Sequence, residues 1–278
     1  MGLRQVEGIL YIVATPIGNL ADFSPRGQQV LAEVGLIVAE DTRHSRNLLN
    51  HYGIKTTMRS MHEHNEEHQV GALVEKLRQG VSIAQVSDAG TPLINDPGFR
   101  LASAAREAAI RVTTIPGPSA PIAALSLSGL SVSRFTFEGF LPAKQGAREQ
   151  LLESLATEVR TMIFFESPRR VMAALGSMER CFGGSRRVAV ARELTKLHET
   201  VHTAPLVELM GWMDEDPNRQ RGEFVLVVEG ASGVVEDHAE AYRLVQLLAK
   251  ELPPRKAAAV AAQFSGAKKN QLYRSLME

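Results

Sequence analysis

The sequence predicts an α/β protein in which two successive α/β domains are followed by a small helical domain. Short apolar runs alternate with amphipathic helical patterns up to about residue 117, which is typical of a mainly parallel sheet covered by helices. Three prolines at 116–121 predict a hinge, and from Asp237 onwards the pattern is entirely helical. We therefore expect domains at 1–117, 118–232 and 237–278.

The composition excludes several classes of protein. Lysine plus arginine and aspartate plus glutamate both number 31 among 278 residues, so any attraction to nucleic acid must come from local patches. The single cysteine, Cys181, excludes an intrachain disulfide framework and a cysteine-rich zinc module. No apolar signal core begins the chain, and no window approaches the ~18 apolar residues of a membrane span. We expect a soluble, cytoplasmic protein with no membrane partner.

The first half is expected to contain four buried parallel strands with helices between them. Ser24 and Pro25 are typical of the cap and first turn of a helix, and another helix is expected over 45–52, ending at Gly53. The strands are expected at 9–14, 36–39, 81–86 and 111–115.

Three histidines within Met61–His68 suggest a metal site at first sight. Their spacings of two and four lack a convincing apolar partner face, and Asn65 is typical of a helix cap. The stretch therefore favours a solvated loop and a helix start, and we expect no metal.

The stretch Val86–Gly98 is typical of a buried strand that runs into a ligand loop and then a helix. Small residues and two prolines leave backbone N–H and C=O groups accessible to something small. Asp96 is predicted to cap the next helix, with Pro97 at its first position and Ala108 near its end. In an open α/β sheet, ligands bind at the carboxyl ends of the strands. A rigid turn without a ligand is the alternative.

The second half is expected to be an α/β domain with more antiparallel character. Ser167 and Pro168 are predicted to begin one helix, and Pro205 another that runs through Trp212. Further helices are expected at 120–130 and 149–155, and strands at 135–138, 161–165, 187–191, 198–202 and 223–228.

The C-terminal segment is expected to form three helices, at 242–252, 255–264 and 268–277. Over residues 250–278 six lysines and arginines oppose two glutamates, a net charge of 6 − 2 = +4. Short helices around a glycine-containing turn, with a basic surface, are compatible with a helix-turn-helix-like contact to nucleic acid. A terminal lid whose lysines are merely solvated is the alternative.

Six motifs in order resemble one family: Ala14–Leu20, Ala39–Arg43, Ser87–Gly98, Pro116–Ser119, Phe164–Arg169 and Arg192–Lys196. The chain is similar to the ribosomal RNA small subunit methyltransferase I family of the tetrapyrrole-methylase superfamily, over residues 9 to about 230 and again at Lys268–Tyr273. The resemblance implies two α/β domains of the tetrapyrrole-methylase type with a cofactor cleft between them and a C-terminal RNA-contacting domain.

The resemblance also implies a homodimeric enzyme that transfers a methyl group from S-adenosylmethionine to the ribose 2′-hydroxyl of a decoding-centre cytidine (C1402-type) in 16S rRNA of the small ribosomal subunit. Carried over by motif, the donor-binding residues would be Pro16, Ile17, Gly18, Asp88, Ala89, Gly90, Thr91, Ile94, Ser119, Ala120, Glu166 and Ala204. Relatives that act on tetrapyrroles have a glycine-richer first loop than Ala14–Gly18, which makes the contact at Ile17 less secure.

A ribose hydroxyl is a weak nucleophile, so we expect a base within hydrogen-bond reach. Asp41 is the first candidate, since it follows a strand end and corresponds to the acidic position of tetrapyrrole-acting relatives. Glu166, Glu193 and Lys196 are rivals, and a lysine would have to be desolvated to act as a base.

Basic side chains are expected to hold RNA phosphates by paired hydrogen bonds, although each could be an ordinary surface residue. They are Arg43, Arg169, Arg170, Arg192, Lys268 and Lys269. Two other functions remain open: methylation of a tetrapyrrole carbon, and a non-catalytic RNA-binding assembly protein that has kept the fold.

Overall fold

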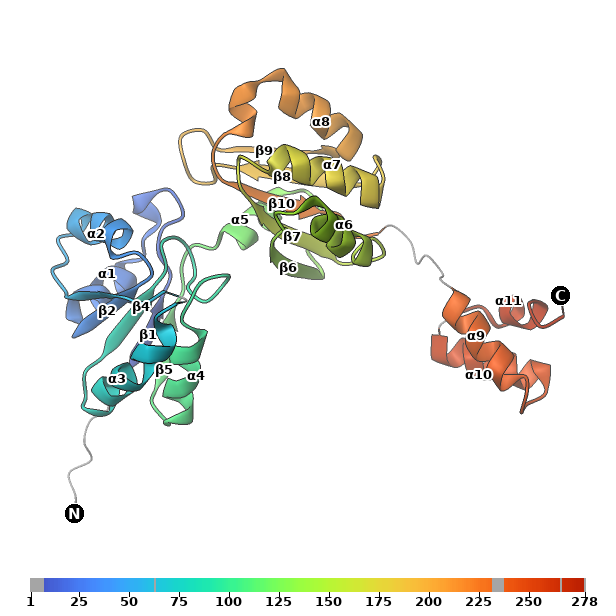
Figure 1. The fold of residues 1–278 in the computed structure, drawn as a ribbon, viewed down its shortest axis with the longest axis horizontal. Coiled ribbons are helices and arrows are strands. Elements are labelled where there is room, and N and C mark those ends of the chain that lie inside the picture. The colour runs from blue at the N-terminus through green and yellow to red at the C-terminus, as the bar shows by residue number, and fades with distance from the viewer. Residues whose placement is uncertain (1–7, 63, 232–237, 266, 278) are drawn as a thin grey trace, which may run out of the picture. The chain divides into compact units, whose positions relative to one another are not determined.

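The computed structural model describes residues 8–62, 64–231, 238–265 and 267–277. The chain forms two compact units, one of residues up to 153 together with 161–229, the other of 154–160 together with the segment from 230. Figure 1 shows both α/β sheets within the first unit and the helices labelled α9, α10 and α11 in the second. The predicted α/β class with a terminal helical part is confirmed, while the exact boundary predicted at 117 stays a prediction.

The first sheet is parallel throughout, with the order β3-β2-β4-β1-β5. Its strands are β1 (Leu10–Val13), β2 (Leu36–Ala39), β3 (Met58–Ser60), β4 (Ile83–Val86) and β5 (Val112–Ile115). Four of them match the predicted apolar runs. The edge strand β3 was not predicted, because its three residues are only partly buried and lack an apolar run. Pairing with β2, in the register Ile37↔Met58, holds it in the sheet.

The helices of this half cover both faces of the sheet and form two apolar cores against it. Ser24 caps the first as predicted, its hydroxyl accepting from the Gly27 N–H at 3.0 Å. The helices are α1 (Pro25–Glu33), α2 (Thr42–His51), α3 (Glu66–Arg78) and α4 (Phe99–Glu107), with a 3-10 turn η1 (Leu20–Asp22).

Two predicted helix starts in this half are wrong. Helix α2 begins at Thr42, not at 45, because the Asp41 carboxylate accepts from the Arg43 N–H and caps the helix. Helix α4 begins after Gly98 at a φ of 117°, so Asp96 is not its cap and Pro97 is not its first residue. The Pro97 carbonyl instead accepts a hydrogen bond from Gln85 at 2.9 Å, which bends the chain before the helix. The Asp96 carboxylate is thereby available for another role.

Asn65 lies at the N-cap position of α3 as predicted, but its side chain does not cap the helix. Its Oδ1 accepts from the backbone N–H of His62 at 2.9 Å and closes the preceding loop.

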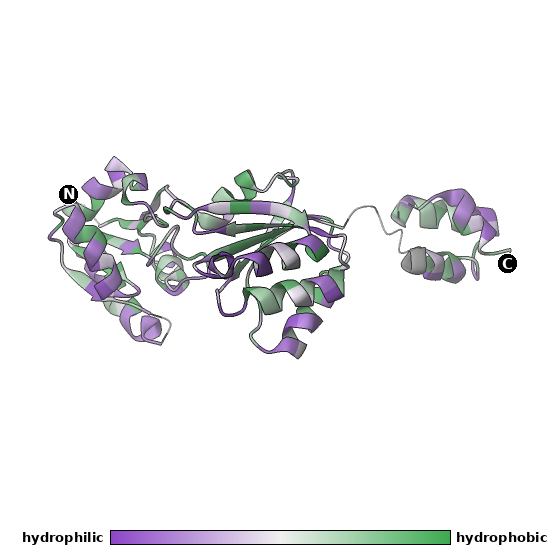
Figure 2. Ribbon diagram, turned by 90° about the horizontal axis from the view of Figure 1, so that it is seen from above, coloured by the Kyte–Doolittle hydropathy of each residue, from purple (hydrophilic) through white to green (hydrophobic). Residues whose placement is uncertain are grey.

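The second sheet is mixed, with the order β6-β7-β10-β8-β9. Only the β6·β7 pair is parallel, so the predicted antiparallel character is confirmed. Its strands are β6 (Phe135–Phe140), β7 (Thr161–Glu166), β8 (Arg187–Arg192), β9 (Thr200–Pro205) and β10 (Phe224–Val228). Figure 2 shows mostly green strands inside this part of the chain, whereas an outer strand and the surrounding helices carry hydrophilic residues as well.

The helices of this half are α5 (Ala120–Leu127), α6 (Gln145–Ser154), α7 (Val171–Phe182) and α8 (Leu206–Glu215), with a 3-10 turn η2 (Pro217–Gln220). The predicted start of α7 at Ser167 and Pro168 is wrong. Residues 167–170 form a turn in which the Arg170 N–H donates to the Ser167 carbonyl, and the helix begins at Val171. Arg170 is held there by an ion pair with Glu166 at 2.8 Å.

The second unit packs α9 (His238–Leu248), α10 (Pro254–Ser265) and α11 (Lys269–Arg274) around their own small core. Val245 and Leu272 are fully buried there, with Ala257, Ala258 and Ala261 of α10. None of the helices among the described residues is long and apolar enough to cross a membrane.

Candidate active site

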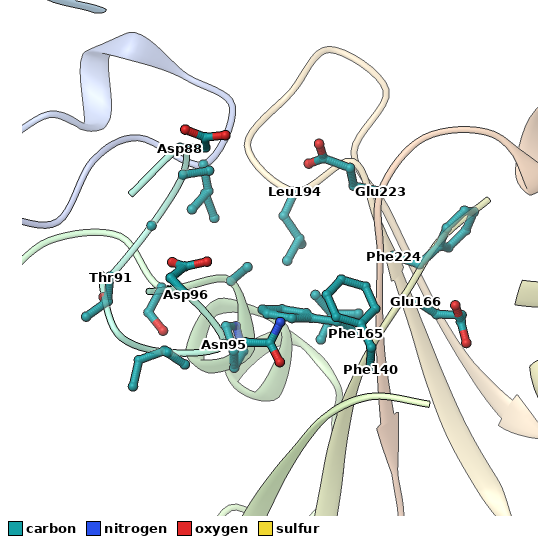
Figure 3. A pocket seen from close by; sticks show the side chains of 18 of the residues that line it. Asp88, Thr91, Asn95, Asp96, Phe140, Phe165, Glu166, Leu194, Glu223 and Phe224 are labelled. Carbon is teal, nitrogen blue, oxygen red and sulfur yellow. The ribbon is translucent and has the colours of Figure 1, made fainter. Parts of the chain in front are cut away.

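A cavity of about 370 Å³ lies between the loops at the carboxyl ends of β2, β4 and β5 and the strands β7, β8 and β10. One side is formed by the loop 87–98, and the other by aromatic and aliphatic residues of the second sheet, as Figure 3 shows. This is the edge at which an open parallel sheet binds ligands.

Side-chain and backbone bonds hold the loop 87–98 in one conformation. Thr15 and Gly90 exchange two backbone hydrogen bonds, of 2.8 and 3.1 Å, and the Thr91 hydroxyl donates to the Pro118 carbonyl at 3.1 Å. Gly90 has a φ of 78° and lies where an added Cβ would come within 3.3 Å of Ile17. The small residues therefore bring loops from three strands together and leave little side chain in the cavity.

Most of the predicted donor-binding residues line this cavity: Ile17, Asp88, Ala89, Gly90, Thr91, Ile94, Ser119, Ala120 and Glu166. Three others do not. Pro16 and Gly18 lie in the first loop outside the lining, where Gly18 gives room to Lys196 of the β8–β9 loop. Ala204 lies in the edge strand β9, opposite Val188.

Three carboxylates stand on one side of the cavity, those of Glu40, Asp88 and Asp96. Burial, with the charge of Glu40 next in weight, raises the pKa of Asp96 to about 6, against a hydrogen bond from Ser87 that lowers it. Asp88 is oriented by the Asp41 N–H, which donates to its Oδ1 at 3.1 Å. A concentration of negative charge beside apolar walls favours a cationic ligand.

Sequence reasoning missed Asp96 and Glu40 as lining residues. Asp96 was predicted to cap α4, since Asp-Pro before an apolar pattern is a strong start signal. A carboxylate within a loop that follows a strand end was the signal that could have identified it.

The opposite wall is largely apolar, although Glu166 and Glu223 also line it, and its aromatic side chains were not predicted. Phe140 and Phe165 pack with their ring centroids 5.4 Å apart, and Leu194 and Val225 continue the wall. Figure 3 shows the Glu166 carboxylate directed away from Phe140 and Phe165. Flat apolar surface of this kind suits an aromatic base.

The three predicted catalytic residues have other contacts. Asp41 caps α2 and bonds the exposed Arg43, and that side-chain hydrogen bond is the main reason why its pKa falls to about 2. Lys196 bonds both Glu193 and Glu223 within 3.0 Å; burial alone would lower its pKa, but these hydrogen bonds raise it. Glu166 is 3% exposed and paired with Arg170. A base must accept a proton at neutral pH, which neither a carboxylate of low pKa nor a paired ammonium does well.

Asp41→Asn is expected to keep donor affinity and methylation rate within about threefold of wild type, because asparagine caps a helix as well as aspartate. Calorimetry for donor binding and a methyl-transfer assay measure the two. Loss of methylation by more than about a hundredfold with intact donor binding would show that Asp41 is the proton acceptor.

The predicted RNA-contacting arginines differ in availability. Arg43 is exposed over 91% of its side chain although it bonds Asp41, and Arg169 is exposed. Arg192 donates to the carbonyls of Arg221 and His198, so its guanidinium is largely committed within the protein. Arg170 is held by Glu166. Lys268 and Lys269 are exposed in the second unit.

Comparisons with known proteins cover nearly the whole chain. The family model Tetrapyrrole (Corrin/Porphyrin) Methylases matches residues 9–210, and the model RsmI C-terminal HTH domain matches residues 235–278. Ribosomal RNA small subunit methyltransferase I of Escherichia coli O157:H7 is 52% identical over 273 residues, which cover 98% of this chain and 96% of the relative. The protein of the same name from Haemophilus influenzae is 51% identical over 274 residues, which cover 98% and 97%.

Solved structures are similar at lower identity. The methyltransferase CobJ gives a TM-score of 0.59 at 19% identity, covering 81% of this chain and 95% of its own. Uroporphyrin-III-C-methyltransferase from Thermus thermophilus gives 0.54 at 18% identity, covering 80% and 94%. At such identities these likenesses describe the fold alone.

Proposed function

Because the chain belongs to the tetrapyrrole (corrin/porphyrin) methylase family and, within it, to the ribosomal RNA small subunit methyltransferase I proteins, we propose that it 2′-O-methylates the ribose of a decoding-centre cytidine in 16S rRNA. The methyl donor is S-adenosylmethionine, which supplies an electrophilic methyl group on a sulfonium centre. The observation that carries the proposal is the cavity with the carboxylates of Glu40, Asp88 and Asp96 on one side and, on the other, a largely apolar wall that Glu166 and Glu223 also line.

The residues of the cavity fit that donor. A sulfonium and an α-ammonium group are cationic, which suits Glu40, Asp88 and Asp96, and the adenine is flat and apolar, which suits Phe140 and Phe165. Ala89, Gly90 and Thr91 of the loop 87–98 have small side chains, so their backbone groups can bond the polar edges of the donor.

The reaction is an in-line displacement, so alignment of the ribose oxygen with the methyl group supplies much of the rate, on the order of 7–11 kcal/mol in favourable cases. The loop 87–98 is held to Thr15 and Pro118 and thus fixes the donor side of that geometry. The proton of the hydroxyl has to leave as attack proceeds. A carboxylate that already lines the cavity is better placed to accept it than Asp41.

The finer expectations belong to the same proposal: a cytoplasmic homodimer that acts on the small ribosomal subunit. Large apolar side chains exposed between residues 122 and 135 support a surface for self-association, namely Ile122, Leu127, Val132 and Phe135. The tetrapyrrole-carbon alternative is less favoured, since ribosomal RNA small subunit methyltransferase I of Escherichia coli O157:H7 shares 52% of its aligned residues with this chain and the uroporphyrin-III-C-methyltransferase only 18%.

Nucleoside mass spectrometry tests the proposal. Small ribosomal subunits from a strain without this modification are incubated with the purified protein and S-adenosylmethionine, and we expect one 2′-O-methylcytidine per 16S rRNA. A methyl group on a base, or methylation of a tetrapyrrole in place of the rRNA, would contradict it. Donor binding without any transfer would favour the non-catalytic alternative.

A further inference from the structure

The second unit contains a strongly basic segment in which one aromatic side chain is exposed to solvent. From Leu252 to Met277 the sequence contains no acidic residue and five basic ones: Arg255, Lys256, Lys268, Lys269 and Arg274. A segment of that charge is complementary to a polyanion.

Helix α10 distributes its side chains in an unusual way. It buries the alanines 257, 258 and 261 in the core of the unit, yet its phenylalanine, Phe264, is 87% exposed. Val260, one turn earlier, is 42% exposed, and Lys256 lies one turn before that. Residues four apart share a face of a helix, so Lys256, Val260 and Phe264 form one stripe that runs beside the buried alanines.

The Ser265 side chain is held at the end of α10 by two hydrogen bonds. The Ser265 hydroxyl donates to the Ala261 carbonyl at 2.6 Å and accepts from the Ala267 N–H at 3.3 Å. Leu272 is fully buried and fixes α11 against the core, while Lys268 and Lys269 stay exposed. Phe264 therefore has lysines before and after it in the sequence, Lys256 on one side and Lys268 and Lys269 on the other.

We propose that Phe264, with Lys256, Lys268 and Lys269, forms a stacking site for an unpaired base of ribosomal RNA. The lysines neutralise the flanking phosphates and the exposed ring takes the base. Base–aromatic stacking combined with a basic groove is the usual way in which proteins hold single-stranded nucleic acid. A protein partner would instead need acidic residues to match five cations and would have no requirement for an aromatic side chain at position 264.

The inference rests on the proposed function, since it names the surface that holds the same substrate. The experiment uses the full-length chain and unmethylated small ribosomal subunits. The variants are Phe264→Ala, Phe264→Leu and Phe264→Trp, and the matched control is Leu247→Ala, an exposed apolar residue of α9. The dissociation constant for the subunits, that for S-adenosylmethionine and thermal unfolding are measured for each.

We expect Phe264→Ala and Phe264→Leu to weaken subunit binding about tenfold, Phe264→Trp to keep it, and the control to change nothing. Donor affinity and thermal unfolding stay at wild-type values, because the ring is outside the core. Lys268→Gln and Lys269→Gln are each expected to lower the slope of log affinity against log salt by about one.

Wild-type affinity in Phe264→Ala would overturn the inference. Wild-type affinity for the subunits in Phe264→Leu, combined with weaker binding in Phe264→Ala, would also overturn it. That pattern is expected when an apolar side chain docks on a protein surface and does not stack on a base. In both cases methylation of the subunits by the wild-type chain leaves the proposed function standing. Failure of the wild-type chain to bind or methylate the subunits would remove the proposed function, and this inference with it.

Discussion

Replacing Asp96 with asparagine is expected to weaken S-adenosylmethionine binding by about 10- to 100-fold, the range of a hydrogen bond to a charged group. The side chain lines the cavity between Asn95 and the acidic neighbours Glu40 and Asp88, and it is half-buried. A cationic donor loses one full negative charge at short range in this variant. Isothermal titration calorimetry at a pH of about 7.5, well above the pKa of the carboxyl, measures the change.

The same substitution is expected to stabilise the ligand-free protein. Burial raises the pKa of Asp96 to about 6, from its ordinary value of 3.8, so the folded state holds the proton more tightly than the unfolded one. The contribution of the protonated Asp96 carboxyl to the unfolding free energy is fully present below pH 3.8, and it is lost as the pH rises through 6. At about pH 7 the ionised carboxylate opposes folding by roughly 1 kcal/mol after allowance for solvent screening. The Asp96→Asn variant should therefore have a higher unfolding free energy than wild type at about pH 7 and no such advantage at about pH 4.

Donor binding should depend on pH in the opposite sense. Wild-type affinity is expected to fall as the pH drops through about 6, because the donor prefers the ionised carboxylate, and Asp96→Asn should remove that step. Asp214→Asn, at an exposed carboxylate of α8 outside the cavity, is the matched control and should leave both profiles unchanged. An Asp96→Asn protein with wild-type affinity would show that the carboxylate does not contact the donor.

Gly98→Ala is expected to lower the unfolding free energy by about 2–4 kcal/mol, and hence the melting temperature by roughly 5–15 °C. Gly98 has a φ of 117°, and a Cβ there would overlap Nε2 of Gln85. Gln85 is buried and bonds the Pro97 carbonyl, so it cannot move away without breaking the turn that ends the loop 87–98. Donor affinity should fall as well, because that loop lines the cavity.

Gly71→Ala is the matched control, at a glycine on the exposed side of α3 where an added Cβ meets nothing within 4 Å. It should stabilise the protein by about 0.5–1 kcal/mol, as alanine does in helix interiors. Thermal unfolding of both variants measures the difference. Equal melting temperatures would mean that the Val86–Gly98 turn tolerates a side chain and that its geometry is not fixed by Gly98.

Most of the fold could be predicted because buried strands appear in the sequence as apolar runs. Strands such as β4 and β10 lie in the centre of their sheets and consist of apolar residues almost throughout. Strand β3 could not be found in this way, since its pairing with β2 comes from tertiary contacts and not from its own three residues. The predicted starts of α4 and α7 were wrong for a shared reason. Asp-Pro and Ser-Pro are good helix starts locally, but Gln85 and Glu166 hold those residues in turns.

Only part of the candidate site could be predicted. Residues that are close together in the sequence were found, whereas residues that meet through strand pairing were not. The loop 87–98 could be predicted, because glycine, proline and small residues after a strand end identify a ligand loop in one stretch of sequence. The aromatic wall could not, since Phe140 and Phe165 belong to different strands and meet only through the β6·β7 pairing. The role of Asp41 was inferred by resemblance, and its contacts with Arg43 and Asp88 emerge only from the three-dimensional structure.

The central claim is that the cavity between the loop 87–98 and the wall of Phe140 and Phe165 holds the methyl donor. A crystal structure of the chain grown with S-adenosylhomocysteine, the product of transfer, tests it most directly. We predict the adenine against the apolar wall, the amino-acid end beside Asp96 and Asp88, and the sulfur facing open solvent where a ribose can approach. An empty cavity with the ligand bound elsewhere, or no bound ligand at saturating concentration, would contradict the account.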